Sequence, residues 1–255
     1  MKFRLLALGV LLVWGFIKMP WESALDAEQR KLTLGATGQV TMEMRDKLGQ
    51  GLTLAALGGF RGLAATAVWL LLHNAWEDGD WAWLRTYAEL GVLLQPRDTY
   101  FWENASWHLA YNASIGMQND AKDLTPDERR KESRRWVDEG IKMLQRGIQA
   151  NPEKGILYER LAELYQQRLG DYRKAAHYYE LAAECPDGAK YLPRFAGYML
   201  LKAGDDQQAY EYWKKIWPKL SAQERSSSQW GRVRQEIKKL EEKLNLPRQD
   251  RILMN

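Results

Sequence analysis

The chain is poor in the residue types on which metal binding and catalysis usually depend. Its 255 residues include a single cysteine, Cys185, which cannot form a disulfide within the chain. The three histidines are not spaced with one another or with the cysteine as metal ligands are. No glycine-rich stretch carries the lysine and hydroxyl residue of a phosphate-binding loop, and no nucleophile elbow occurs. The sequence therefore predicts a protein without metal, cofactor or enzymatic activity.

An excess of positive charge is also missing from most of the chain. The formal net charge is +4, but residues 219–251 alone contain nine Lys and Arg residues against five Asp and Glu residues. The first 218 residues are therefore neutral overall. A nucleic-acid-binding protein needs cations clustered at the spacing of phosphates, so we expect no nucleic-acid partner.

What the chain does contain is a repeat with a period of 34 residues. The pair Gly170-Asp171 recurs as Gly204-Asp205. The same spacing relates three further pairs, which are Ala175 and Ala209, Tyr179 and Trp213, and Pro152 and Pro186. A fixed period of this length is typical of stacked helical hairpins that bury their apolar faces against one another. The predicted fold class is therefore all-α.

These residues resemble the signature of the tetratricopeptide repeat family. In the third repeat the matching positions are Tyr158, Leu161, Ala162, Tyr165, Gly170, Tyr172, Ala175, Tyr179, Ala182 and Pro186, with one extra residue before Gly170. In the fourth they are Gly197, Leu200, Gly204, Ala209 and Trp213. The resemblance implies a solenoid of about four helical hairpins over residues 64–218. The first two hairpins match less closely.

Two segments depart from the regular period. The step from Pro96 to Pro152 is 56 residues, and the surplus is a polar insertion at 118–135 within the second repeat. After the repeats, residues 219–255 form a charged segment in which Ile237, Leu240 and Leu244 make one apolar stripe. We expect this segment to be a helix that caps the last repeat, followed by a tail.

The first 21 residues have the layout of a secretory signal. Lys2 and Arg4 precede 13 apolar residues, Leu5 to Ile17. No small-x-small cleavage site follows, and no cysteine is available for lipid attachment. We therefore predict that residues 1–21 remain as a single membrane anchor, with the rest of the chain on the outer, periplasmic side of a cytoplasmic membrane.

A second apolar stretch runs from Leu52 to Leu72, but Arg61 lies near its middle. Because a charge there is costly in lipid, we expect this stretch to pack against the first repeat, with residues 22–63 as a helical linker and packing segment. Arg61 then needs a partner. It either pairs with an acidic residue such as Glu43 or Asp46, or it binds a partner or a lipid headgroup.

Candidate binding residues follow from the family resemblance, in which the first helices of successive repeats line a concave groove. The exposed positions of those helices are Tyr191, Arg194, Tyr198 and Lys202 in the fourth repeat, and Tyr100, Glu103, Trp107 and Tyr111 in the second. Aromatic residues and arginine are enriched in interface hot spots. They are equally typical of ordinary helix packing, so both interpretations remain open.

The predicted function is that of a membrane-anchored adaptor that binds another protein through its concave helical surface. As a whole, the chain also resembles uncharacterised bacterial envelope proteins that join a membrane segment to such repeats. Two alternatives remain. The chain could be a structural subunit of a larger membrane complex, or an envelope enzyme acting on glycans or peptides, for which the sequence offers no paired catalytic groups.

Overall fold

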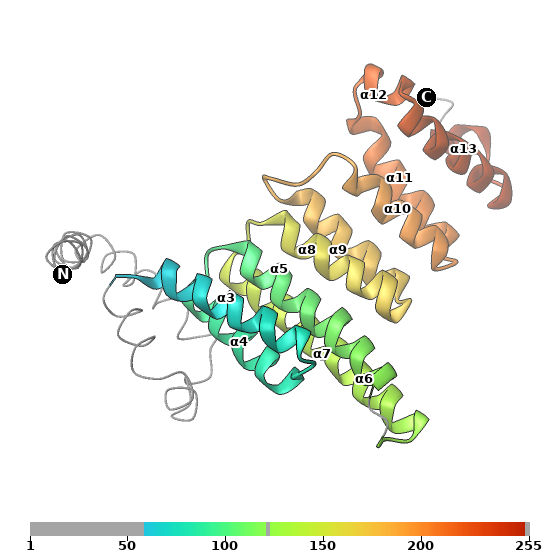
Figure 1. Ribbon diagram of the computed structural model, residues 1–255. Helices are drawn as coiled ribbons and strands as arrows, with labels where there is room; N and C mark the ends of the chain where they lie inside the picture. The colour runs from blue at the N-terminus through green and yellow to red at the C-terminus, as the bar shows by residue number, and fades with distance from the viewer. Residues whose placement is uncertain (1–58, 121–122, 253–255) are drawn as a thin grey trace, which may run out of the picture. The chain divides into compact units, whose positions relative to one another are not determined.

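The computed structural model describes residues 59–120 and 123–252, and within these ranges the chain is helical and contains no strand (Figure 1). The predicted all-α class is therefore confirmed. The chain divides into two compact units at Pro152 and Glu153. Unit 1 comprises the described residues up to 152, and unit 2 those from 153 onward.

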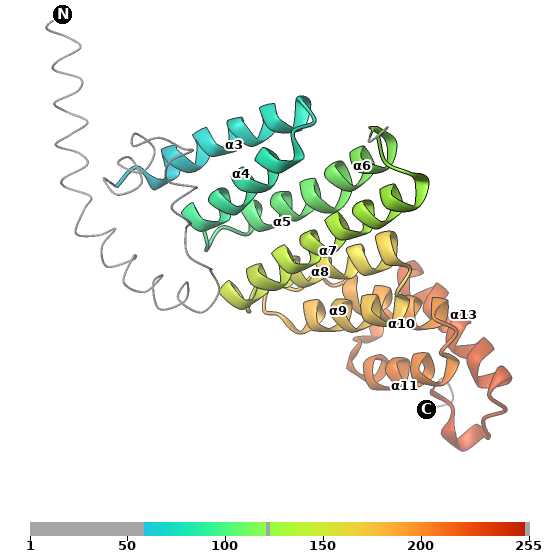
Figure 2. The same cartoon turned by 90° about the horizontal axis from the view of Figure 1, so that it is seen from below.

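Unit 1 consists of two helical hairpins that lie side by side (Figure 2). The first pairs α3 (Arg61–Glu77) with α4 (Trp81–Leu94). The second pairs a long rod with α7 (Pro126–Ala150). The rod is continuous through α5 (Thr99–Trp107), the π-helical η1 (His108–Ala113) and α6 (Ser114–Asp120).

Close packing inside the second hairpin depends on two glycines of α7. A Cβ at Gly147 would lie 2.9 Å from the buried Trp102 ring, and one at Gly140 would lie 2.9 Å from the carbonyl oxygen of Ser106. The Ser106 hydroxyl donates to the Gly140 carbonyl at 2.8 Å. Between the hairpins, Arg146 of α7 forms a bidentate ion pair with Glu89 of α4, with both bonds at 2.8 Å.

Unit 2 contains two more hairpins followed by a shorter helical segment. In the hairpins, α9 (Tyr172–Glu184) packs against both α8 (Gly155–Leu164) and α10 (Leu192–Lys202), and α10 also packs against α11 (Asp206–Ile216). After the short η3 (Trp217–Lys219) and α12 (Ala222–Ser226), α13 (Ser228–Lys243) packs on α11. A last turn, η4, covers Arg248–Asp250.

The repeated Gly-Asp pair makes the turn within each hairpin of unit 2. Gly170 and Gly204 have φ angles of 63° and 73°, which residues with a Cβ rarely adopt. The aspartate that follows each glycine caps the second helix. The Asp171 carboxylate accepts from the Lys174 N–H, and the Asp205 carboxylate accepts from the Gln208 N–H. Gly79-Asp80 makes the same turn between α3 and α4.

The extra residue before Gly170 is accommodated without a loop. The helix that begins as α8 widens into the π-helical η2 (Tyr165–Leu169), and Gly170 then ends it. One residue inserted into an α-helix commonly produces such a π-turn. The buried positions of α8 before the insertion and of α9 after it are both retained, including Leu161 and Ala175, each 0% exposed.

The polar insertion at 118–135 proves to be largely helical. It extends the rod through α6 and provides the first ten residues of α7. Thr125 and Glu128 form a reciprocal capping box that starts α7. Beyond it, Arg130 pairs with Asp127, which is the pattern of an exposed helix surface.

In the segment after residue 219, the predicted apolar stripe of α13 is only partly buried. Ile237 and Leu240 are buried, while Leu244 is half-buried. Two adjacent acidic residues of α13 differ in environment. Glu242 is exposed, whereas Glu241 is buried and its Oε1 accepts the N–H of Ile252 at 2.8 Å. Burial follows because the chain after α13 folds back over this side of the helix.

The predicted anchor at 1–21 and most of the predicted linker lie outside the described residues. Among the helices that are described, none is long and apolar enough to span a membrane. The apolar stretch that we treated as continuous is broken at Gly59, whose φ is 84°, and α3 begins at Arg61. The Arg61 guanidinium donates to the carbonyl of Leu93 at 3.3 Å. Both acidic residues proposed as its partners lie outside the described ranges.

Candidate protein-binding surface

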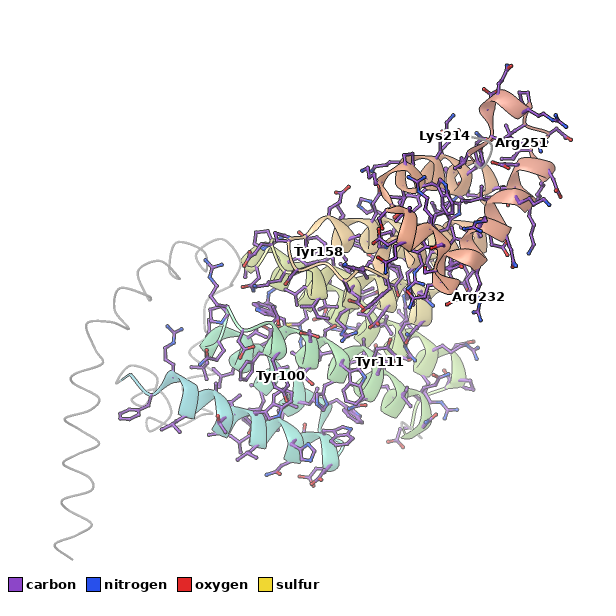
Figure 3. All side chains as sticks on the ribbon, turned by 90° about the horizontal axis from the view of Figure 1, so that it is seen from above. Tyr100, Tyr111, Tyr158, Lys214, Arg232 and Arg251 are labelled. Atoms are coloured by element: carbon purple, nitrogen blue, oxygen red, sulfur yellow. The ribbon has the colours of Figure 1, made fainter. Side chains whose placement is uncertain are left out.

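The candidate residues of the second repeat lie along the rod of unit 1, where Figure 3 labels Tyr100 and Tyr111. Spacings of three, four and four residues place Tyr100, Glu103, Trp107 and Tyr111 on one side of the helix. Tyr100 and Trp107 are 51% and 47% exposed, and Glu103 and Tyr111 are half-buried. The Trp107 and Tyr111 rings stack at 6.5 Å between centroids.

Rings from α3 extend this group of aromatic side chains. Trp69 lies 5.5 Å from Tyr100 and 5.7 Å from His108, measured between ring centroids. Trp76 lies 5.7 Å from the same histidine. We refer to the resulting surface of α3, α5 and η1 as the aromatic face, which consists of Trp69, Trp76, Tyr100, Trp107, His108 and Tyr111.

His108 lies at the centre of the aromatic face and is itself buried. The Asn112 side-chain amide donates to its Nδ1 at 3.0 Å, which leaves the proton of the neutral ring on Nε2. Burial, and to a smaller extent the charge of His73, lowers the pKa of His108 to about 4. The ring is therefore neutral at physiological pH and acts as part of the packing.

Two asparagine side chains of this rod form hydrogen bonds within the rod itself. The Asn104 amide donates to the Tyr100 carbonyl at 2.8 Å, and the Asn112 amide is used by His108. The face therefore presents mainly ring surfaces, beside which lie the half-buried Glu103 and the Tyr100 and Tyr111 side chains. Such a surface is suited to apolar and aromatic side chains more than to a strongly polar ligand.

In unit 2, Tyr191 forms the most specific contact among the candidates of the fourth repeat. It precedes α10 directly, and its hydroxyl donates to Oε1 of the buried Glu159 on α8 at 2.6 Å. That hydrogen bond, followed by burial and the charge of Glu159, raises the pKa of Tyr191 to about 12. Its ring also packs against Phe195, with centroids 5.4 Å apart. Tyr191 therefore links two helices in addition to exposing part of its ring.

The other three candidates of the fourth repeat follow along α10. The Arg194 Nε is buried and has no hydrogen-bond partner among the described residues. Tyr198 packs edge-on against Trp213 at 6.0 Å, and burial, followed by the charge of Glu236, raises its pKa. Lys202 is exposed, with its Nζ 5.5 Å from the Tyr172 ring centroid. Of two signature positions on the same helix, Gly197 is buried and Leu200 is half-buried, while Met199 beside Leu200 is buried.

Sequence reasoning missed three rings in two parts of these surfaces. Trp69 and Trp76 were not among the predicted binding residues, although their spacing of seven residues places both on one side of a helix. Phe195 is 41% exposed beside Tyr191 and was not singled out. In both cases the missing information was which neighbouring helix lies beside the ring.

Within the described ranges, no group of three or more His, Cys, Asp or Glu side chains is arranged to hold a metal ion. Comparison with known proteins adds no assignment. No protein-family model matches the chain, and no curated protein matches it significantly in sequence.

Proposed function

We propose that the protein is a membrane-anchored adaptor built of tetratricopeptide-like helical hairpins, and that it binds a segment of another protein on the aromatic face. One observation carries the proposal. Tyr100 and Trp107 leave about half of their surface exposed, although ring contacts with Trp69, His108 and Tyr111 hold them in place. Exposed aromatic rings that are already ordered lose little side-chain entropy when a partner binds.

The chemistry of the face indicates what it binds. Its polar amides are used within the rod, so the ligand need not supply many hydrogen bonds. A segment with apolar or aromatic side chains would bury the free ring surface and gain most from contact. In the tetratricopeptide family, which the sequence resembles, the first helices of adjacent hairpins line the ligand groove. The first helices of the two hairpins of unit 1 are α3 and α5, which supports the choice of this surface.

Site-specific photo-crosslinking in cells tests this surface directly. A benzophenone amino acid in place of Trp107 should crosslink to a discrete protein. The same group in place of Lys131, an exposed residue of α7, serves as the control and should give no such product. Equal crosslinking patterns at the two positions would show that the aromatic face has no specific partner.

Paired substitutions then distinguish the two candidate surfaces. Tyr100→Ala with Trp107→Ala should weaken binding of the crosslinked partner by about 2–4 kcal/mol, as loss of hot-spot residues does. If Arg194→Ala with Tyr198→Ala has that effect instead, the working surface lies on α10. Circular dichroism of both variants must show unchanged helical content. A partner that cannot be removed without loss of the fold would favour the structural-subunit alternative.

The membrane part of the proposal rests on residues 1–21 and needs its own experiment. Removal of these residues should release a soluble protein that keeps its helical content. If the mature protein isolated from native membranes begins after Trp21, the segment is a cleaved signal and the anchor is wrong.

A further inference from the structure

Arg194 of α10 has a half-buried guanidinium that no described residue binds. Its Nε is buried, and none of its nitrogens forms a hydrogen bond or an ion pair with a described residue. The Nε of Arg146 is buried as well, but the terminal nitrogens of that residue hold Glu89. Because a buried polar group without a partner is costly, and a charged one more so, Arg194 needs an anion that the described residues do not supply.

A second guanidinium without a bound partner lies near the first. Arg232 of α13, labelled in Figure 3, is exposed and forms no hydrogen bond or ion pair with a described residue. Burial, followed by the charge of Glu236, raises the pKa of Tyr198, as noted above. The charges of Arg194 and Arg232 both act to lower the same pKa. Both guanidinium groups are therefore near the Tyr198 hydroxyl.

Helix packing explains how α10 and α13 reach the same hydroxyl. Tyr198 lies one turn after Arg194, on the same side of α10. Its ring packs edge-on against the buried Trp213 of α11, with centroids 6.0 Å apart. Trp213 packs in turn on Trp230 of α13 at 6.2 Å, and Arg232 follows two residues later. The same buried indole thus connects the two helices that carry the arginines.

Glu236, the acidic residue whose charge reaches Tyr198, already has a partner. Its carboxylate accepts from the Lys239 Nζ at 2.8 Å, so two positive charges remain without a bound acidic group. Arginine binds phosphate through its fork of N–H donors, and a phosphomonoester carries about two negative charges at neutral pH. We propose that Arg194, Arg232 and the Tyr198 hydroxyl bind a phosphate group.

Two sources supply such a group, which are inorganic phosphate and a phosphomonoester. Exposed rings lie beside the site, because Tyr191 precedes Arg194 by one turn and Phe195 follows it directly. The two rings are 38% and 41% exposed. An organic phosphate would bury part of their surface, whereas inorganic phosphate would not. The proposal does not depend on the aromatic face of unit 1 having a partner.

Equilibrium dialysis of the full-length protein in a neutral detergent tests the site with radiolabelled inorganic phosphate. Sodium chloride keeps the ionic strength constant. Arg194→Gln and Arg232→Gln should each weaken phosphate binding at least about tenfold, because each removes charge-assisted hydrogen bonds. Arg248→Gln is the matched control, since Arg248 is an exposed arginine of the same unit without an ion pair to a described residue. It should change the affinity by less than about twofold.

Thermal melting distinguishes this site from a structural role of Arg194. Arg194→Met removes the unpaired charge, so it should raise the melting temperature in phosphate-free buffer. Phosphate at about ten times its Kd should raise the melting temperature of the original protein and leave that of Arg194→Met unchanged. A lower melting temperature of Arg194→Met in phosphate-free buffer would show that the fold uses the guanidinium, which contradicts the premise.

Phenyl phosphate identifies the source of the group. Binding at least about fivefold tighter than that of inorganic phosphate would assign the site to an organic ligand that also contacts the rings. Equal affinity would assign it to free phosphate, and both results support the site. Equal weakening by Arg248→Gln would reduce the effect to net charge and overturn the proposal. Displacement of phosphate by an equal concentration of acetate would also overturn it, because the site would then not prefer a phosphate group.

Discussion

Gly197→Ala offers a sharp test of how α10 and α11 pack, because a second glycine in unit 2 provides a matched control. A Cβ at Gly197 would overlap Cζ2 and Cη2 of Trp213 and lie 2.6 Å from its Cε2. The Trp213 side chain is fully buried, so the indole has little room to move. At Gly231 of α13, by contrast, a Cβ would meet no atom within 4 Å.

The expected magnitudes follow from two opposing effects. Replacing glycine with alanine within a helix contributes up to about 1 kcal/mol, because the unfolded chain loses freedom. Forcing a methyl group into a filled core costs about 1–3 kcal/mol. At Gly197 the carbon–carbon distances would be well below the usual 3.5–4.0 Å, so we expect a cost at the upper end of that range, from which the gain of up to about 1 kcal/mol is subtracted. We therefore expect Gly197→Ala to lower the free energy of unfolding by about 2 kcal/mol. Gly231→Ala should raise it by about 0.5–1 kcal/mol.

Urea and thermal denaturation followed by far-ultraviolet circular dichroism would measure both changes. For a unit of this size, about 2 kcal/mol corresponds to a melting temperature lowered by roughly 8–16 °C. If both substitutions stabilise the protein equally, Trp213 does not pack on Gly197. The arrangement of α10 against α11 would then be wrong.

Three further contacts can be tested by substitution. Ala175→Leu, at a position with no exposed surface, should cost about 1–3 kcal/mol, whereas Gln207→Leu on the exposed side of α11 should change stability by less than about 0.5 kcal/mol in the same urea titrations. Because the pKa of His108 is about 4 in the folded protein and near 6.5 in the unfolded chain, stability should decline as the pH falls from about 6.5 to 4. His108→Asn should flatten that decline in melts across this range, and an unchanged slope would assign it to other groups. Tyr191→Phe removes the hydroxyl donor to buried Glu159 and should cost about 1–3 kcal/mol in urea titrations, and no loss would mean that water replaces the donor.

Features that depend on local backbone chemistry could be predicted from the sequence. The 34-residue period located the turns at Gly170 and Gly204 because a left-handed backbone strongly favours glycine there. The aspartate that follows each glycine caps the next helix, again through a contact within a few residues. Helical class and hairpin boundaries were therefore accessible without knowledge of any long-range contact.

Features that depend on contacts between distant residues could not be predicted. Nothing local to Glu241 distinguishes it from Glu242, and only the returning chain at Ile252 explains why one is buried. Tyr191 likewise depends on Glu159, which lies 32 residues earlier. The polar composition of 118–135 suggested extra chain between two helices, because composition alone does not reveal that the capping box at Thr125 starts a long exposed helix.

Two tryptophans of the rod bear on the proposed function. Trp102 and Trp107 are five residues apart on one rod, yet the first is buried and the second is 47% exposed. Five residues correspond to about 140° around a helix, so the two rings lie on different sides of the rod. On the side of Trp102, Gly147 leaves room for the ring, as Gly197 does for Trp213. No described glycine makes such room for Trp107. Its ring therefore contributes less to packing than its residue type suggests, which supports assigning it to the binding of a partner.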